Sequence, residues 1–149
     1  MHIVQQTGIF HVAGIELRTS NSEAAQTIPQ HWQRFQQEGV PARLPDKLSD
    51  EVYAVYTRFE NEGRSNEGVY SLVLGAKVRP DAVLPPGFTR VLVPAGPRMV
   101  FPVEAGRFDL VSQVWQTIWN FHERKKTFIA DYERYGAGGA IDIFIGIRD

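Results

Sequence analysis

Hydrophobic and polar positions alternate along much of the chain, which predicts a protein built largely from strands. The most regular stretch is residues 141–147, where isoleucine occupies every second position, a period typical of a strand with one buried face. Residues 51–59 and 68–78 alternate in the same way on either side of the polar segment 61–66, so they predict a hairpin. The pattern also predicts strands over 8–18, 89–94, 98–103 and 127–135, and a loop over 40–50.

Two other segments carry hydrophobic residues three and four positions apart, which places them on one face of a helix. The first covers residues 24–38, and Ser20–Ser22 precede it as candidate N-cap residues. Pro29 lies inside this segment and would either kink the helix or stand in the first turn of a helix that restarts just before it. The second helix is predicted after Asp109, its N-cap, and it ends with the cations Arg124–Lys126, which complement the helix dipole.

The predicted elements follow the same order twice along the chain. The order strand–helix–strand–strand occurs before and after the proline-rich segment 79–87. Each half is too small to bury its own sheet face, so the halves should pack together. We therefore predict an α+β fold in one domain over residues 1–149, with half-repeats of about 1–79 and 88–149.

Composition excludes several classes of function. The 149 residues are 43% hydrophobic with a net charge of −1, which is untypical of a disordered chain. This charge gives no long-range attraction for phosphate backbones, so we expect no direct binding of nucleic acid. No apolar run approaches the ~18 residues of a membrane span. The absence of cysteine excludes thiol catalysis and a disulfide scaffold, and it suits a reducing cytoplasm.

Known catalytic and metal-binding motifs are missing from the sequence. It contains no G-x-S-x-G, H-E-x-x-H or Walker motif. The four histidines are scattered without the spacing of metal ligands. Residues 136–139 are glycine-rich but precede a strand pattern rather than a helix, so they indicate a hairpin turn. We predict no catalytic residue, metal or cofactor.

Aromatic residues are numerous, with 9 Phe, 5 Tyr and 3 Trp. These rings could simply fill the core. Tryptophan and tyrosine are costly core residues, however, because each buried N–H or O–H needs a partner. Rings from both helices that converge between the two halves would instead form the wall of a pocket.

Glu133 is the acidic residue that we single out, because it lies among Phe128, Ile129, Tyr132 and Tyr135 in a segment with the pattern of a strand. In a strand it projects from the opposite face to Tyr132. That face could be exposed to solvent, as in many antiparallel sheets. Alternatively, Glu133 could form the floor of an aromatic cleft, where burial raises the pKa of its carboxyl and a cationic ligand favours the ionised form. Glu60 competes for this role, but it lies beside a polar turn.

Seven short stretches, in order along the chain, resemble the GyrI-like small-molecule-binding domain, which is the effector-binding domain of AraC- and MerR-type regulators. These stretches are Ile28–Phe35, Tyr53–Tyr56, Gly68–Gly75, Val93–Gly96, Val114–Trp119, Tyr132–Tyr135 and Ile141–Ile145. The resemblance implies two βαββ units in a pseudo-twofold arrangement, which form a curved antiparallel sheet with two helices and a central ligand cleft.

In multidrug-sensing members of that family, an acidic residue of a Phe/Tyr-Glu-x-Tyr motif meets lipophilic cations among aromatic rings. The resemblance therefore implies that Glu133 is the acidic anchor. The implied ring walls are Trp115, Tyr56 and Tyr70, with Trp32, Phe35, Phe101 and Trp119 as further candidates.

This sequence departs from the family pattern in two places. The pattern of strands begins near residue 8, which leaves no room for a helix-turn-helix, so a transcriptional role would need a DNA-binding regulator as a protein partner. Pro97 and Arg98 also follow Gly96 where the family often has an aromatic and a small residue, which affects the expected pocket rim.

The leading hypothesis is a binding module that senses or sequesters amphipathic, cationic small molecules. The alternative implied by the resemblance is a hydrolase of strained, cyclopropane-containing natural products that uses the same cleft. A third possibility is an accessory protein that binds another protein.

Overall fold

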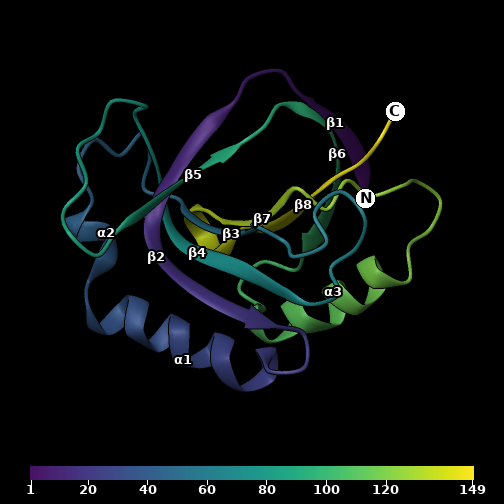
Figure 1. Cartoon of the computed structure of the whole chain (residues 1–149), viewed down its shortest axis with the longest axis horizontal. Helices are drawn as coiled ribbons and strands as arrows, with labels where there is room; N and C mark the ends of the chain where they lie inside the picture. The colour runs from purple at the N-terminus through teal and green to yellow at the C-terminus, as the bar shows by residue number, and fades with distance from the viewer.

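The computed structural model describes all residues 1–149. Eight antiparallel strands form one sheet in the order β1-β6-β8-β7-β3-β4-β2-β5, and helices α1 and α3 cover one of its faces (Figure 1). The strands are β1 (His2–Gln6), β2 (Phe10–Ser20), β3 (Val52–Thr57), β4 (Val69–Val78), β5 (Thr89–Val93), β6 (Gly96–Val103), β7 (Ala130–Tyr135) and β8 (Ile141–Gly146). The helices are α1 (Ala24–Gln37), α2 (Val40–Arg43) and α3 (Val111–Trp119), with short 3-10 helices η1 (Phe108–Leu110) and η2 (Ala137–Gly139).

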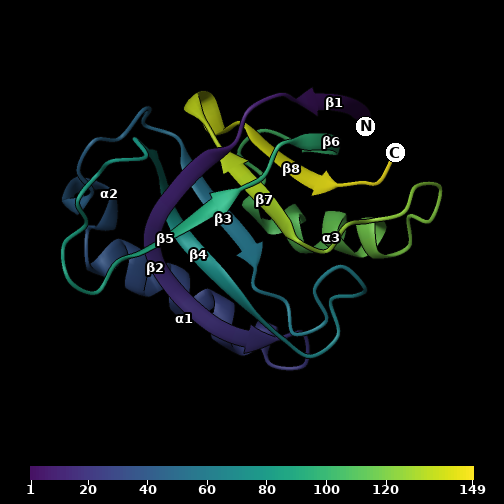
Figure 2. The same ribbon diagram turned by 45° about the horizontal axis from the view of Figure 1, so that its top comes forward.

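The two βαββ units predicted from the sequence are present. The first is β2-α1-β3-β4 and the second is β6-α3-β7-β8, and they meet where β3 pairs with β7 at the centre of the sheet. The predicted α+β class and curved antiparallel sheet are confirmed (Figure 2). Two outer strands complete the sheet: β1 pairs with β6 of the second unit, and β5 pairs with β2 of the first.

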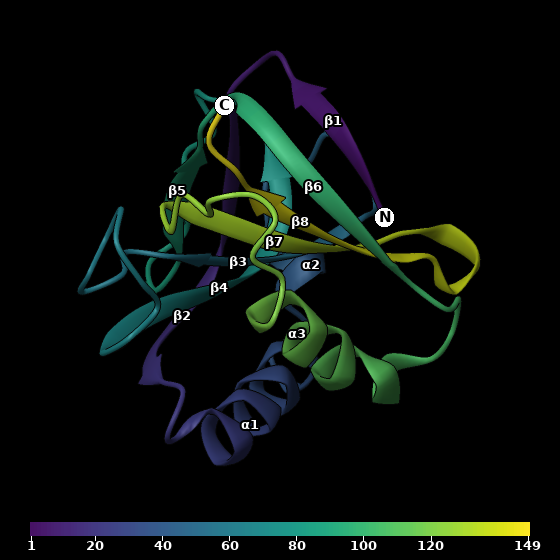
Figure 3. The same ribbon diagram turned by 90° about the vertical axis from the view of Figure 1, so that its right-hand side faces the viewer.

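Alternating side chains give the sheet two buried faces. On the face toward the helices, Ala54 and Leu74 pack with residues of α1, and Ile143 packs with residues of α3. On the other face, Val55 and Tyr132 belong to a third hydrophobic cluster, which the curled ends of the sheet partly enclose. Figure 3 shows α1 and α3 beside each other beneath the sheet.

A pair of glycines allows β2 and β4 to approach closely. Gly14 and Gly75 lie directly opposite each other in the antiparallel register. A Cβ atom on Gly75 would lie 1.7 Å from the carbonyl oxygen of Ala13, and one on Gly14 would lie 1.9 Å from that of Leu74. Only glycine fits at either position, because any side chain would push the two strands apart.

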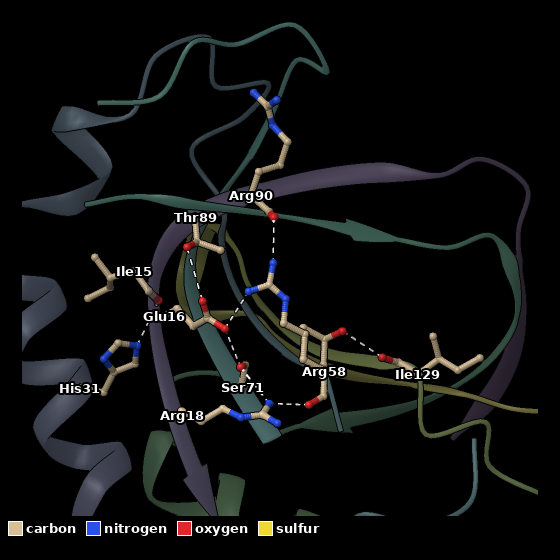
Figure 4. Close-up of polar contacts among 10 residues, drawn as sticks. Ile15, Glu16, Arg18, His31, Arg58, Ser71, Thr89, Arg90 and Ile129 are labelled. Carbon is tan, nitrogen blue, oxygen red and sulfur yellow. Dashed lines mark hydrogen bonds and ion pairs between the residues drawn. The ribbon is translucent and has the colours of Figure 1, made fainter. Parts of the chain in front are cut away.

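A polar network joins β2 to β4 and β5 on the face of the sheet opposite the helices (Figure 4). Glu16 Oε2 accepts hydrogen bonds from Arg58 Nη1 at 2.7 Å and from Ser71 Oγ at 2.6 Å, and Oε1 accepts one from Thr89 at 3.4 Å. Arg58, Ser71 and Thr89 come from three different segments of the chain. These contacts hold the segments together, because they give the Glu16 carboxylate hydrogen-bond partners from each of them.

Several local predictions differ from the structure. Strand β1 was not predicted, because its alternation is short and it lies at a sheet edge, largely exposed. The predicted loop 40–50 contains the short helix α2.

The predicted helix caps are also wrong. The N-cap of α1 is Glu23 rather than one of Ser20–Ser22, and Asp109 lies within η1; neither helix has a side-chain cap. Helix α3 ends at Trp119, before the predicted end at Arg124–Lys126, whereas α1 continues through Pro29. No helix of the chain is both long enough and apolar enough to cross a membrane.

Candidate functional site

A cavity of about 980 Å³ lies between the sheet and the two helices. Strands β3, β4 and β7 supply its floor, and α1 and α3 supply its walls. Seven of the eight site residues predicted from the sequence line it, namely Glu133, Trp115, Tyr56, Tyr70, Trp119, Trp32 and Phe35. The two units meet at the β3–β7 strand pair, which we call the seam. Each helix packs mainly on its own unit, so a space remains between the helices at the seam.

Phe101 is the exception and does not line this cavity. Its side chain is 4% exposed and belongs to the cluster between α3 and the second unit. Its ring packs edge-on against Phe121 at 5.5 Å between centroids. Phe101 faces the helix side of β6, but β6 is separated from the seam by β8 and β7, so the ring is core.

Glu133 faces the cavity rather than solvent, and its side chain is 2% exposed. Three neutral groups donate hydrogen bonds to its carboxylate. Tyr56 Oη and Trp115 Nε1 donate to Oε2 at 2.9 and 2.7 Å, and Tyr135 Oη donates to Oε1 at 2.5 Å. β3, α3 and β7 each contribute one donor, so the carboxylate joins both units at the seam.

No lysine or arginine forms an ion pair with Glu133, whose hydrogen-bond partners are all neutral. Burial raises the pKa of its carboxyl, and the hydrogen bonds from Tyr135, Trp115 and Tyr56 act in the opposite direction. An ionised carboxylate in such a place is costly unless a cation compensates it. Its surroundings therefore favour a positively charged neighbour that the chain itself does not supply.

Aromatic rings run in contact along the cavity. Tyr56 lies 5.0 Å from Trp115 and 5.9 Å from Tyr70, measured between ring centroids. Next to Glu133, Tyr135 contacts Trp32 at 5.4 Å and stacks with Phe108 at 6.0 Å. Such rings offer π faces and apolar area to a flat or bulky organic ligand.

Residues 3–147 match the model of the family Cass2, described as integron-associated effector binding protein. The chain belongs to this family. The expected resemblance to effector-binding domains is thereby confirmed, because the family match extends over residues 3–147.

Known proteins similar to this effector-binding protein agree with that assignment. The Bacillus subtilis (strain 168) protein named "Putative transcriptional regulator protein YobU" is 28% identical over 148 residues, which cover 91% of both chains. An integron cassette protein from the mobile metagenome of Vibrio cholerae has a TM-score of 0.78 at 22% identity, over 99% of this chain and 95% of its own. SAV2435, solved bound to tetraphenylphosphonium, has a TM-score of 0.80 at 19% identity, over 99% and 94%.

The two solved neighbours share the fold of this effector-binding protein. Its membership of the effector-binding family supports small-molecule binding as its function.

The cavity also includes residues that sequence analysis did not select. Tyr135, Phe108 and Asp131 line it, as do Phe59 and Phe128. Tyr135 and Asp131 were recognisable only in retrospect, because both are two positions from Glu133 and alternate strand residues share a face. Phe59 and Phe128 lie outside the regular elements, where no periodicity indicates a direction.

Arg98 does not alter the pocket rim, although it departs from the family pattern. It is 3% exposed and lies on the opposite face of the sheet, with its guanidinium 5.1 Å from the ring centroid of Tyr132. Its Nη1 and Nη2 donate to the main-chain oxygens of Ala130 and Pro94 at 2.8 and 3.0 Å. Arg98 therefore ties β6 to neighbouring segments rather than shaping the cavity.

Proposed function

We propose that this protein binds amphipathic cationic small molecules in the cavity between α1, α3 and the sheet, and that binding serves to sense or sequester them. Glu133 is the acidic anchor. Trp115 and Tyr56 form ring walls in contact with it, Tyr70 packs beside Tyr56, and Trp32, Phe35 and Trp119 extend the apolar surface. A DNA-binding regulator as a protein partner would carry this response to transcription.

The observation that carries this proposal is the buried carboxylate of Glu133, which has three neutral hydrogen-bond donors and no cationic partner in an aromatic cavity. A cationic ligand would supply the missing charge. Each well-placed ring would add about 0.5–2 kcal/mol of cation–π attraction. The tetraphenylphosphonium complex of SAV2435 supports the same chemistry in a protein of this fold.

The proposal can be tested with two ions of equal shape and opposite charge, tetraphenylphosphonium and tetraphenylborate. Calorimetry should detect saturable binding of the phosphonium at one site and weaker binding of the borate. In Glu133→Gln, whose amide keeps a hydrogen-bond acceptor but carries no charge, phosphonium affinity should fall about tenfold or more, corresponding to at least ~1.4 kcal/mol. The preference for the cation should shrink accordingly.

Glu60→Gln provides a matched control. Glu60 is exposed, lies outside the cavity and accepts the backbone N–H of Val69 with Oε1, a contact that glutamine preserves. The variant has the same change in net charge, so unchanged phosphonium affinity would exclude a general electrostatic effect. Equal binding of both ions by the natural protein, or undiminished phosphonium affinity in Glu133→Gln, would contradict the proposal.

A further inference from the structure

A second buried carboxylate, Asp131, lines the same cavity. It lies two positions before Glu133 on β7, so both side chains project from the same face of the strand. Asp131 is 5% exposed and Glu133 is 2% exposed. Alternate residues of a strand are roughly 7 Å apart along the backbone, so the two acidic side chains start from points separated by about that distance.

One oxygen of Asp131 remains free of the protein's own hydrogen bonds. Oδ1 accepts the backbone N–H of Gly146 at 2.8 Å, whereas Oδ2 accepts no hydrogen bond from the chain. Arg98 and Lys126 act on Asp131 through their charge, and Lys126 lines the cavity, but neither donates a hydrogen bond to Asp131. Lys126 Nζ donates to the carbonyl oxygen of Phe121 at 2.6 Å, and Arg98 donates to two main-chain carbonyl groups on the other face of the sheet.

A second group of aromatic rings lies at the Asp131 end of the cavity. It lies opposite Tyr56 in the β3–β7 register. Beyond that pair, Tyr70 contacts Phe59 at 5.9 Å between centroids, and Phe59 contacts Phe128 at 6.4 Å. These rings line the cavity at the end where β3 finishes and β7 begins, whereas Trp115 lies at the Glu133 end. Tyr56 lies between the two carboxylates and contacts rings of both groups.

We propose that the cavity prefers elongated aromatic dications, with one cationic centre beside Glu133 and the other beside Oδ2 of Asp131. This inference rests on the proposed function and narrows its ligand class. The two centres of a fitting ligand are separated by about the distance between alternate strand residues. Burial also raises the pKa of Asp131 to about 6, so at neutral pH its carboxylate is largely ionised at a cost that a second cationic centre would relieve.

The test compares methyl viologen with the N-methyl-(p-tolyl)pyridinium cation. The two probes have nearly the same shape, but one charged nitrogen of the viologen is replaced by carbon in the monocation. Calorimetry is the suitable method, because viologens quench indole fluorescence without specific binding. The natural protein should bind the dication about tenfold more tightly than the monocation, as expected for one additional charge contact inside a protein.

Variants assign this preference to Asp131. In Asp131→Asn, which keeps the acceptor for the Gly146 N–H, the affinity ratio of dication to monocation should fall to about one. Asp142→Asn is the matched control, since Asp142 lies outside the cavity and pairs with Arg134 on the other face. In Lys126→Gln, which removes a nearby positive charge, the ratio should rise.

The outcomes separate this inference from the proposed function. Tetraphenylphosphonium binding without a preference for the viologen would overturn the inference alone. A preference that persists in Asp131→Asn would also overturn it, as would a Lys126→Gln variant with an unchanged ratio. Failure of all three cations to bind would overturn both. If Asp131→Asn does not fold, the affinity ratio of dication to monocation in the natural protein and in Lys126→Gln still tests the inference.

Discussion

Asp131 should destabilise the unliganded protein at neutral pH. Burial raises the pKa of its carboxyl from 3.8 to about 6, and this effect outweighs the opposing hydrogen bond from Gly146 and the charges of Arg98 and Lys126. The difference between the folded and unfolded states is therefore about two pKa units. At ~1.36 kcal/mol per unit, the ionised side chain lowers the free energy of unfolding by about 3 kcal/mol.

The contribution of Asp131 to the free energy of unfolding decreases as the pH rises, because the pKa of its carboxyl is higher in the folded state than in the unfolded chain. Between about pH 4 and pH 6 the folded protein binds more protons at Asp131 than the unfolded chain does. The contribution to stability is fully present below the unfolded pKa and is lost as the pH rises through about 6. This direction is opposite to that of a carboxylate held in a salt bridge.

Urea unfolding of the natural protein and of Asp131→Asn, followed by circular dichroism from about pH 4 to pH 8, measures this effect. The amide introduced by the substitution does not titrate, and Glu133 is present in both proteins, so their difference isolates Asp131. The variant should be more stable by up to about 3 kcal/mol at pH 8, and the difference should decrease toward pH 4. Parallel pH profiles for the two proteins would refute this reasoning.

Three further predictions concern the glycine pair, the indole donor and the ring outside the cavity. Gly75→Ala should cost more than about 3 kcal/mol of unfolding free energy in chemical denaturation or prevent folding, whereas Gly8→Ala, with no atom within 4 Å of the new Cβ, should be tolerated. Trp115→Phe removes a hydrogen bond to the buried carboxylate and should weaken phosphonium binding several-fold by calorimetry, more than Trp119→Phe does. Phe101→Leu should lower the melting temperature but leave phosphonium affinity unchanged.

Regular alternation made the centre of the fold predictable. The strands β3, β4 and β8 and the helix α1 are long enough that their periodicity dominates over local exceptions. The edge strand β1 was not predicted, because its sequence shows no strong alternation. Its pairing with a single neighbour, β6, holds it in place. The helix caps could not be read from Ser20–Ser22 or Asp109, since tertiary packing determines where each helix begins.

The candidate site was only partly predictable, for a geometrical reason. Alternation shows that Glu133 and Tyr132 lie on opposite faces of a strand, but not which face the helices cover. The structure places α1 and α3 on the side of Glu133, and it is this docking that creates the cavity. Phe101 illustrates the same difficulty, because a ring on the helix face of β6 belongs to the core when its strand lies away from the seam.

The pairing of β1 and β5 with distant strands has consequences for how the chain reaches its native state. β1 finds its partner only in β6, roughly a hundred residues later, and β5 returns to β2 of the first unit. Such distant pairings raise the contact order, so we expect slow folding in a single cooperative transition rather than one unit at a time. Strand β1, made first during synthesis, would stay unpaired until β6 leaves the ribosome.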